Sequence, residues 1–569
     1  MSDAKEAVET KSSWSDEPVY SQQSPYSETS TGGSKWQNFK DSWKRADPDS
    51  VLKGDGGNEL KKGMKKRQLQ MIALGGCVGS GLLVASGKAL TYGPASVVIA
   101  WTVVSTFLYC TMQSLAEMSA VLPVDGSFAV YSARFIHPSW GFAMGWNYAL
   151  FWVVVLPVEL VAASMTINFW PSDINNDAWV AIFYVVIIGL NLCGQKGFAE
   201  TEFVASVIKL LGVVGWDIFA IVMIAGGGKQ GYIGAKYWHN PGSFTGGFKG
   251  VVSVLVTATY SLAGTELIGL TASESKENPR IVLPKAIKQV FWRIVIFYML
   301  TLILIGFIVP KNSPKLMNGT SDNSASPFVI AINDAGVKGL DSVFNAVILI
   351  ALLSIGNSAV YGFSRTMLGL AKEELAPKIF LYVDRKGRPL VGIAVCAIIG
   401  LISFVAASPK QGEVFAWLMA LSGLSTLFTW GSICGAHIQF RRALYHQGRT
   451  TDELPYVANT GFWGAVYGLL CNIVVLCFQF WISVWPIGKQ PDAQYFFEQY
   501  LAAPIVLAFF LGHYFFFYKG WNLLIPVSQI DIDTGRKEVD VDMLRQEKEE
   551  ELARRKALPF YKKITAFLC

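Results

Sequence analysis

The chain has 569 residues, of which 52% are hydrophobic and only 16% are charged, with a formal net charge of +6. A soluble protein covers its surface with charged residues that make up about a quarter of the chain. The composition therefore excludes an ordinary soluble protein and indicates a membrane protein. The positive charge suits loops that face an anionic leaflet. No basic domain is interleaved with aromatic residues, so no nucleic-acid partner is expected.

Residues 1–60 are polar and precede the first apolar segment. They predict a cytoplasmic, disordered tail without a cleavable signal peptide. Within this tail, Trp36, Phe39 and Trp43 recur at helical spacing among lysine residues. This pattern predicts a short amphipathic helix, lying either on the membrane surface or on the protein's own cytoplasmic face.

Twelve apolar segments follow the tail. A helix needs about 20 apolar residues to cross a hydrocarbon core roughly 30 Å thick. The segments cover residues 69–91, 94–121, 140–167, 178–194, 201–225, 250–270, 288–309, 341–370, 390–407, 413–440, 463–485 and 500–519. We therefore predict an all-α membrane protein with a twelve-helix transporter core in residues 61–520 and a cytoplasmic C-terminal tail in residues 521–569.

Basic residues cluster ahead of the first segment and after the sixth, eighth and tenth segments. By the positive-inside rule, these regions and both termini are expected to be cytoplasmic. The sequon at Asn318 then falls in an outer loop and is a candidate for glycosylation. The eight cysteines avoid the outer loops, so no extracellular disulfide framework is expected. The terminal Cys569 is either palmitoylated at a membrane surface or an unmodified thiol.

The first and sixth segments contain residues that weaken a helix. The first has four glycines between residues 75 and 81, and the sixth has small and polar residues between Thr259 and Glu266. Single glycines in membrane helices usually allow close packing. Clustered glycines in one helix and a second interruption five segments later instead indicate two broken helices at the central site of a transporter.

Unwound backbone at these breaks offers hydrogen-bonding groups of opposite polarity. The N–H groups freed at residues 79–81 lie at the start of a half-helix and suit a carboxylate. Carbonyls freed near Cys77, Tyr260 and Ala263 suit an ammonium group, and Gly264 belongs to the same break. The two sets together predict a site for a zwitterionic α-amino acid. Tyr260 is either a lid over the substrate or an aromatic residue of the core.

Three ionisable residues lie deep inside apolar segments: Glu159, Lys209 and Glu266. A charged side chain at the centre of a membrane helix costs at least about 2.5–3.5 kcal/mol, so each is a candidate for proton coupling. The alternative is a fixed ion pair between Lys209 and a glutamate that only orients helices. Glu117 is expected to anchor a cytoplasmic loop, and His437 to be a packing or interface residue.

Three longer stretches resemble a known family. They are residues 263–275, which read AGTELIGLTASES, residues 284–293, which read PKAIKQVFWR, and residues 383–390, which read VDRKGRPL. From these stretches, the chain is similar over residues 36–569 to the fungal amino-acid permeases of the amino acid–polyamine–organocation superfamily, and most similar to the general amino-acid permease group. The resemblance implies two inverted five-helix repeats plus two further helices, broken helices 1 and 6, and alternating access.

The resemblance also implies roles for single residues. The matched residues are Gly79, Ser80 and Gly81 for carboxylate binding, Tyr260 as an aromatic gate, and Glu159 and Glu266 as carboxylates implicated in transport and coupling. Lys209 matches the lysine that takes the place of a sodium ion in sodium-independent relatives. Protons are therefore the expected coupling ion.

Members of the family lie in the plasma membrane, and lysines in their N-terminal tails receive ubiquitin before endocytosis. Lys5 and Lys11 are the candidates here, which makes the ubiquitin-ligase machinery an expected partner. The family's terminal Phe-Trp-Cys palmitoylation signal is present as Phe567-Leu568-Cys569, and Leu568 departs from that pattern.

The leading interpretation is a plasma-membrane amino-acid:proton symporter of broad specificity, with amino acids, protons and membrane lipids as partners. Two alternatives are open: a narrow permease for basic amino acids or proline, and an amino-acid sensor that does not transport. The tail has an ordinary length, which disfavours the sensor. The sequence has no phosphate-loop motif, metal-binding cluster or nucleophile triad, so neither an enzyme nor a cofactor or metal is expected.

Overall fold

The computed structural model describes residues 43–44, 71, 78–124, 126–171, 173–267, 269, 279–317, 326–407, 411–488, 490–518, 520–534, 536 and 559. The chain divides into two units, residues 1–44 and 45–569, and the long helices belong to the second. Several residues singled out from the sequence lie outside the described residues, namely Lys5, Lys11, Cys77, Asn318 and Cys569. The expected N-terminal amphipathic helix also lies outside them, apart from Trp43.

Six of the described helices are long and apolar enough to cross a membrane. They are α5 (Pro94–Val121), α7 (Pro138–Ile167), α9 (Gly194–Ile224), α16 (Leu340–Lys372), α18 (Gln411–His446) and α19 (Gly461–Val484). A seventh candidate is the pair α20 (Ala493–Tyr500) and α21 (Ala502–Phe516), which meet at a bend of 65°. The protein is therefore a helical, multi-pass membrane protein.

Five further apolar helices are shorter. They are η1 with α4 (Gly81–Ala85 and Ser86–Leu90), α8 (Asn176–Leu192), α11 (Gly247–Leu262), the later part of α13 (Pro279–Ile308), and α17 with η4 (Leu390–Gly400 and Leu401–Ala407). By length alone they do not qualify as membrane spans, so the count of twelve crossings stays a prediction.

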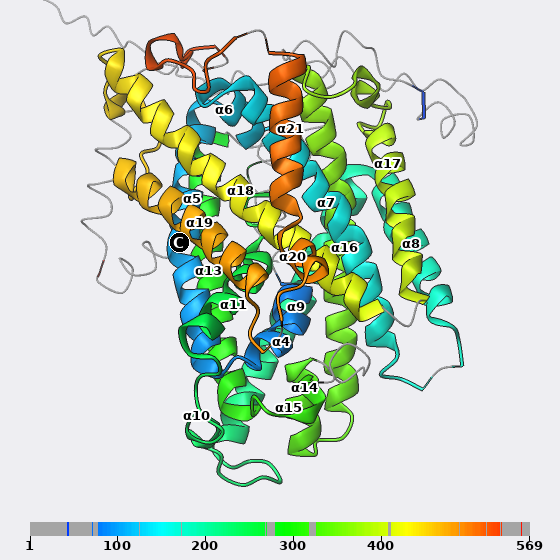
Figure 1. Ribbon diagram of the computed structural model, residues 1–569. Helices are drawn as coiled ribbons and strands as arrows, with labels where there is room; N and C mark the ends of the chain where they lie inside the picture. The colour runs from blue at the N-terminus through cyan, green and yellow to red at the C-terminus, as the bar shows by residue number, and fades with distance from the viewer. Residues whose placement is uncertain are drawn as a thin grey trace, which may run out of the picture. The chain divides into compact units, whose positions relative to one another are not determined.

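Short helices connect the long ones. They are α6 (Phe128–Phe135), α10 (Lys236–His239), α14 (Pro314–Met317), α15 (Pro327–Ala335), η3 (Lys378–Leu381), η5 (Thr451–Glu453) and η6 (Val527–Gln529). Figure 1 shows α6 near one end of the long helices and α10, α14 and α15 near the other.

Helix α7 lies at the centre of the packing. It packs against α16, α18 and α21, and its neighbours are seen beside it in Figure 1. In its most apolar window 89% of the residues are buried, so this helix contacts protein on nearly all sides. Pro157 lies inside α7 and removes one backbone hydrogen bond from the helix. Glu159, one of the candidate residues, follows two positions later.

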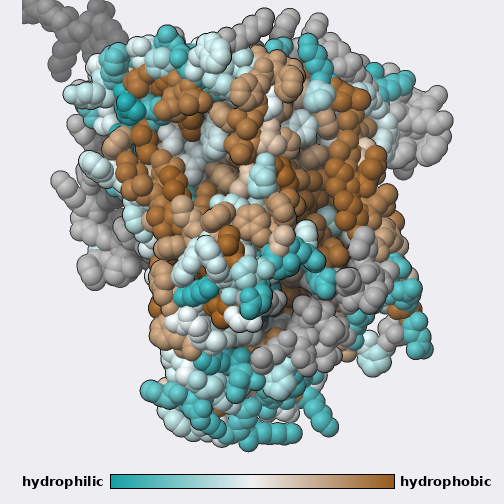
Figure 2. Space-filling view, in the orientation of Figure 1, coloured by the Kyte–Doolittle hydropathy of each residue, from teal (hydrophilic) through white to brown (hydrophobic). Residues whose placement is uncertain are grey.

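Large apolar side chains cover the outside of the bundle. Val185, Leu211 and Ile398 are each 67% exposed, and Ile218 and Val343 are also largely exposed. Figure 2 shows a broad hydrophobic surface over the helices that turns hydrophilic toward the end that carries α10. Water disfavours apolar patches of this kind on a soluble protein, whereas hydrocarbon accepts them.

Glu117, near the end of α5, anchors a loop as the sequence predicted. Its carboxylate accepts hydrogen bonds from His437 Nε2 at 3.0 Å, from Arg441 Nη2 at 2.6 Å and from the backbone N–H of Ala458 at 2.6 Å. The first two donors come from α18, and Ala458 belongs to the connection between α18 and α19. His437 is correspondingly an interface residue between α5 and α18.

Candidate functional site

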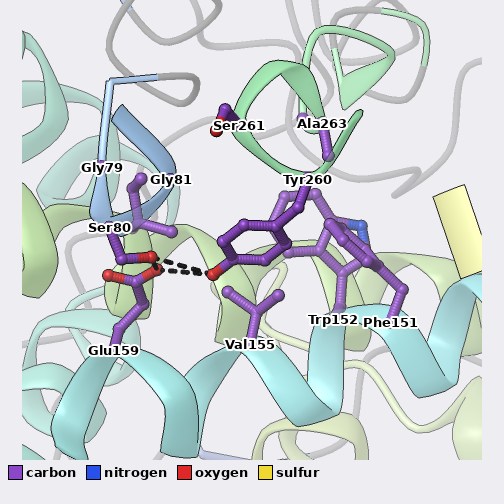
Figure 3. A pocket seen from close by; sticks show the side chains of 12 residues that line it. Gly79, Ser80, Gly81, Phe151, Trp152, Val155, Glu159, Tyr260, Ser261 and Ala263 are labelled. Atoms are coloured by element: carbon purple, nitrogen blue, oxygen red, sulfur yellow. Dashed lines mark hydrogen bonds between the residues drawn. The ribbon is translucent and has the colours of Figure 1, made fainter. Parts of the chain in front are cut away.

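A small cavity lies where residues 79–81 of the first segment and residues 260–264 of the sixth segment meet α7 and α16. Its lining residues are Gly79, Ser80, Gly81, Phe151, Trp152, Val155, Glu159, Tyr260, Ser261, Ala263, Gly264 and Ile355. Figure 3 shows the Tyr260 side chain reaching across the cavity toward Ser80 and Glu159. The cavity includes every predicted substrate-binding residue that the structure describes.

The sixth segment is interrupted where the sequence predicted. Helix α11 ends at Leu262, and residues 263–266 form turns. Gly264 has a φ of +90°, a left-handed conformation that only glycine adopts without strain. The backbone therefore leaves the helix at this point and exposes hydrogen-bonding groups to the cavity.

Glycines bring the first segment close to this break. A Cβ atom on Gly81 would lie 2.5 Å from the Cα atom of Ser261, which is backbone and has little freedom to move. Gly81 begins the π-helix η1, a rare geometry that is often found at functional sites. Gly81 thus allows the close approach of the two backbones, whereas residues 72–77, with the other half of the glycine cluster, lie outside the described residues.

Three buried side chains form a hydrogen-bonded triangle at the cavity. Ser80 Oγ donates to Glu159 Oε1 at 2.5 Å, and Tyr260 OH donates to the same oxygen at 3.2 Å. The two hydroxyl oxygens are 2.9 Å apart. All three side chains are less than a tenth exposed. Glu159 therefore accepts two side-chain hydroxyls, beside the backbone N–H groups of residues 79–81 that the sequence analysis reserved for a substrate carboxylate.

Lys209 lies outside the cavity lining, on α9. Its Nζ atom is 3.7 Å from Glu202 Oε1, and both side chains are almost fully buried. Glu202 Oε1 also accepts a hydrogen bond of 2.5 Å from Ser354 Oγ on α16. Lys209 thus takes part in an ion pair, and its partner is on the same helix, so the pair by itself does not join two helices. Sequence analysis missed Glu202, although a glutamate seven residues before a buried lysine shares its helix face.

Glu266 also lies outside the cavity lining. One carboxylate oxygen accepts the Gly264 N–H at 3.2 Å, and the other accepts the Trp430 indole N–H at 3.2 Å. The first contact satisfies backbone that the break in α11 sets free, and the second ties this region to α18. Sequence analysis also missed the apolar walls, formed by Phe151, Trp152, Val155 and Ile355, because they look like ordinary core residues.

Tyr260 separates the cavity from a second, polar cavity. Polar side chains that line this second cavity are Lys88, Tyr92, Ser253, Thr257, Gln479, Tyr495 and Gln499. Tyr260 borders both spaces, which is the position a lid would take. Among the described residues, no group of three or more His, Cys, Asp or Glu side chains could hold a metal ion.

A helical membrane protein with a small internal cavity beside an interrupted helix has the architecture of a transporter. The family model for amino acid permeases matches residues 68–523. The chain belongs to the amino acid permease family, whose members are transporters and not enzymes.

Individual relatives agree with this assignment. The "Amino-acid permease GAP6" of Candida albicans is 63% identical over 94% of this chain and 95% of its own length. The "General amino-acid permease GAP1" of Saccharomyces cerevisiae is 52% identical over 94% of this chain and 92% of its own length. A solved manganese transporter from Eremococcus coleocola shares the fold, with a TM-score of 0.50 and 13% identity over 78% of this chain and 92% of that one.

Proposed function

We propose that this protein is an amino-acid:proton symporter of broad specificity that lies in the plasma membrane and works by alternating access. Amino acids as the substrate class follow from the family and from relatives named general amino-acid permeases. One structural observation supports proton coupling: the carboxyl group of Glu159 is hydrogen-bonded by Ser80 and Tyr260 inside the cavity.

The coupling follows from competition between two carboxylates. A substrate carboxylate that binds the N–H groups of residues 79–81 comes close to Glu159, which already accepts the Ser80 hydroxyl. Two carboxylates in one site repel each other strongly enough that one of them takes up a proton. Protonation of Glu159 thus makes room for the substrate's negative charge, so the proton and the amino acid are carried together.

The remaining parts of the cavity suit the rest of an amino acid. Carbonyls at the break of α11 serve the ammonium group, although the Tyr260 carbonyl already accepts the Ala263 N–H at 3.2 Å. The apolar walls contributed by α7 and α16 receive the side chain. An apolar pocket discriminates between side chains by only about 1–3 kcal/mol per methylene, and this weak discrimination supports a broad substrate range.

The proposed topology has twelve membrane crossings arranged as two inverted five-helix repeats plus two helices, with both termini in the cytoplasm. In support, the seven long candidates and the five shorter apolar helices follow the twelve sequence segments in order. The positions of the basic residues support the orientation.

The decisive experiment is uptake of radiolabelled amino acids by the purified protein in liposomes, with and without an imposed pH gradient and with and without sodium. We expect accumulation that requires the pH gradient and not sodium. Competition by unlabelled amino acids of different classes then measures the substrate range. Inhibition by one chemical group alone would favour a narrow permease, and binding without any transport would favour a sensor.

A further inference from the structure

Glu202 is a fully buried carboxylate that plays no part in the cavity described above. It lies on α9 with 0% of its surface exposed. Its Oε1 atom accepts the Ser354 hydroxyl from α16 at 2.5 Å and lies 3.7 Å from Lys209 Nζ. A buried charge of this kind persists only with a partner. Lys209 is the partner of opposite charge, and Ser354 adds a hydrogen bond.

The geometry of α9 directs Lys209 toward Glu202. Residues seven positions apart lie on the same helix face, with a rise of about 10.5 Å between them. Side chains on a helix tilt toward its N-terminus, so the long lysine side chain leans back toward the earlier glutamate. The ion pair therefore forms along one helix, and the hydrogen bond from Ser354 fixes its position against α16.

Glu202, Lys209 and Glu159 are linked through one stretch of α16. Ser354 of α16 donates its hydroxyl to Glu202, which lies beside Lys209. Two residues further along α16, a Cβ atom on Gly356 would lie 3.7 Å from the Cβ atom of Glu159 on α7. Further along α9, Asp217 is hydrogen-bonded by Thr301 of α13 at 2.8 Å and lies about 12 Å beyond Lys209 along the helix.

We propose that Glu202 is a positioning residue for proton coupling, which holds the Lys209 ammonium charged and in place opposite Glu159. One ammonium and two carboxylates carry one excess negative charge, and a proton on Glu159 brings the buried group to neutrality. Without Glu202, the charges of Lys209 and Glu159 already cancel. A proton on Glu159 would then leave a net positive charge instead of neutrality. This inference rests on the proton symport proposed above.

The test uses Glu202→Gln, which keeps the size of the side chain and an oxygen that accepts the Ser354 hydroxyl while removing the charge. Glu200→Gln is the matched control, because Glu200 is an exposed glutamate on the same helix. Each protein is reconstituted in liposomes. Two quantities are measured: accumulation of labelled amino acid driven by a pH gradient, and exchange of labelled for unlabelled amino acid at equal pH.

We expect Glu202→Gln to lose accumulation by about tenfold or more, within the usual range for coupled sites, and to keep exchange within about twofold. Glu202→Asp, which restores the charge, should recover part of the accumulation. Because Glu202 acts through Lys209, Glu202→Gln added to Lys209→Met should lower accumulation no further than Lys209→Met alone.

Three results would overturn the inference. Wild-type accumulation in Glu202→Gln would show that the charge is not needed. An equal loss of exchange and accumulation, without recovery in Glu202→Asp, would show that Glu202 only holds α9 against α16. Uptake by the wild-type protein that does not depend on the pH gradient would contradict the proposed symport itself. The wild-type measurement alone gives this result, so it is distinguished from a failure of the Glu202 inference.

Discussion

Glu117 and Glu159 are equally buried glutamates with different partners. Glu117 accepts hydrogen bonds from the Arg441 guanidinium, His437 and the Ala458 N–H. A guanidinium is always charged and can only donate hydrogen bonds. Donors reach both oxygens of Glu117, so a proton on either oxygen would face a donor, and the site matches the ionised carboxylate.

The donors at Glu159 are of another kind. Ser80 and Tyr260 are hydroxyl groups, and a hydroxyl can either donate or accept a hydrogen bond. They can serve both the ionised and the protonated form of Glu159. Burial alone therefore does not identify a proton-coupling residue. The hydrogen-bond partners decide whether a buried carboxylate stays ionised and holds a loop, as Glu117 does, or can take up and release a proton, as we propose for Glu159.

The largest effect is expected at Glu117, on the free energy of unfolding. Replacement Glu117→Gln leaves Arg441 without its counter-charge, and breaking a buried pair in this way costs about 3–5 kcal/mol. We expect the free energy of unfolding in detergent to fall by about 3 kcal/mol, since Arg441 is partly exposed. Uptake per folded molecule should keep its wild-type pH dependence. A stable Glu117→Gln variant whose uptake has an altered pH dependence would show that Glu117 takes part in the coupling. It would remove the proposed difference between Glu117 and Glu159.

Replacement Glu159→Gln should show the opposite pattern. The amide oxygen still accepts from Ser80 and Tyr260, so the fold is kept, but the side chain resembles the protonated state permanently. We expect accumulation driven by a pH gradient to fall by about 100-fold, near the upper end of the range for coupled sites. Exchange at equal pH should persist and become independent of pH. Exchange that still varies with pH as in the wild type would place the coupling proton elsewhere.

A smaller effect is expected where the two broken segments touch. Gly81→Ala places a methyl group 2.5 Å from the Cα of Ser261, and overpacking of this kind costs about 1–3 kcal/mol. We expect weaker substrate binding, because the donors at residues 79–81 move away from α11. Gly189→Ala is the matched control, since a Cβ there meets nothing within 4 Å. Equal binding by both variants would show that this contact does not shape the site.

Sequence reasoning located the break in the sixth segment and the residues that line the cavity, because small residues and buried charges leave a local signal. The helix break at Leu262 and the loop anchor at Glu117 were confirmed. The direction in which Glu266 points could not be predicted, because its partner Trp430 is 164 positions away in the sequence. Glu202 was overlooked for a related reason: its contact with Ser354 joins α9 to α16 and depends on how the helices pack.

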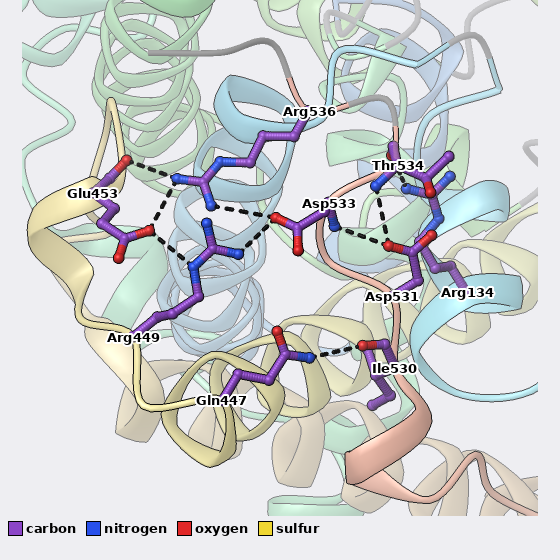
Figure 4. A network of polar contacts seen from close by, with 9 residues as sticks. All are labelled: Arg134, Gln447, Arg449, Glu453, Ile530, Asp531, Asp533, Thr534 and Arg536. Atoms are coloured by element: carbon purple, nitrogen blue, oxygen red, sulfur yellow. Dashed lines mark hydrogen bonds and ion pairs between the residues drawn. The ribbon is translucent and has the colours of Figure 1, made fainter. Parts of the chain in front are cut away.

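A second charged region lies outside the membrane-spanning helices and contrasts with both glutamates. Residues 525–534 and Arg536 contact α6 and the loop after α18 (Figure 4). The hydrogen bonds and ion pairs run from Arg134 to the Thr534 carbonyl, from Gln447 to the Ile530 carbonyl, from Arg449 to Asp533 and Glu453, and from Arg536 to Glu453. Several of these side chains are exposed to solvent, so each contact contributes little by itself.

The smallest expected effect is therefore in this region. Arg449→Ala should cost less than about 1 kcal/mol, because water and salt screen exposed ion pairs. We expect faster amide hydrogen exchange in residues 525–534, while Lys315→Ala, which breaks the exposed pair with Asp334 near α14, should leave that exchange unchanged. Unchanged exchange in Arg449→Ala would show that the ion pairs do not hold the segment.

The same segment should respond to pH through Asp531. Hydrogen bonds from the Thr534 side chain and backbone lower the pKa of the Asp531 carboxyl below its usual value. Because the pKa is lowered in the folded state, ionised Asp531 stabilises the folded segment at pH values above its unfolded pKa of about 3.9. This contribution is lost as the pH falls through the folded pKa. We expect amide exchange in residues 525–534 to be constant from pH 7 to about pH 5, after correction for intrinsic rates, and to accelerate only below about pH 4. Asp531→Asn should remove this acid-dependent step, since no proton is then taken up. A step that survives in Asp531→Asn would assign the acid response to another carboxylate, of which Glu453 and Asp533 are the nearest in the network.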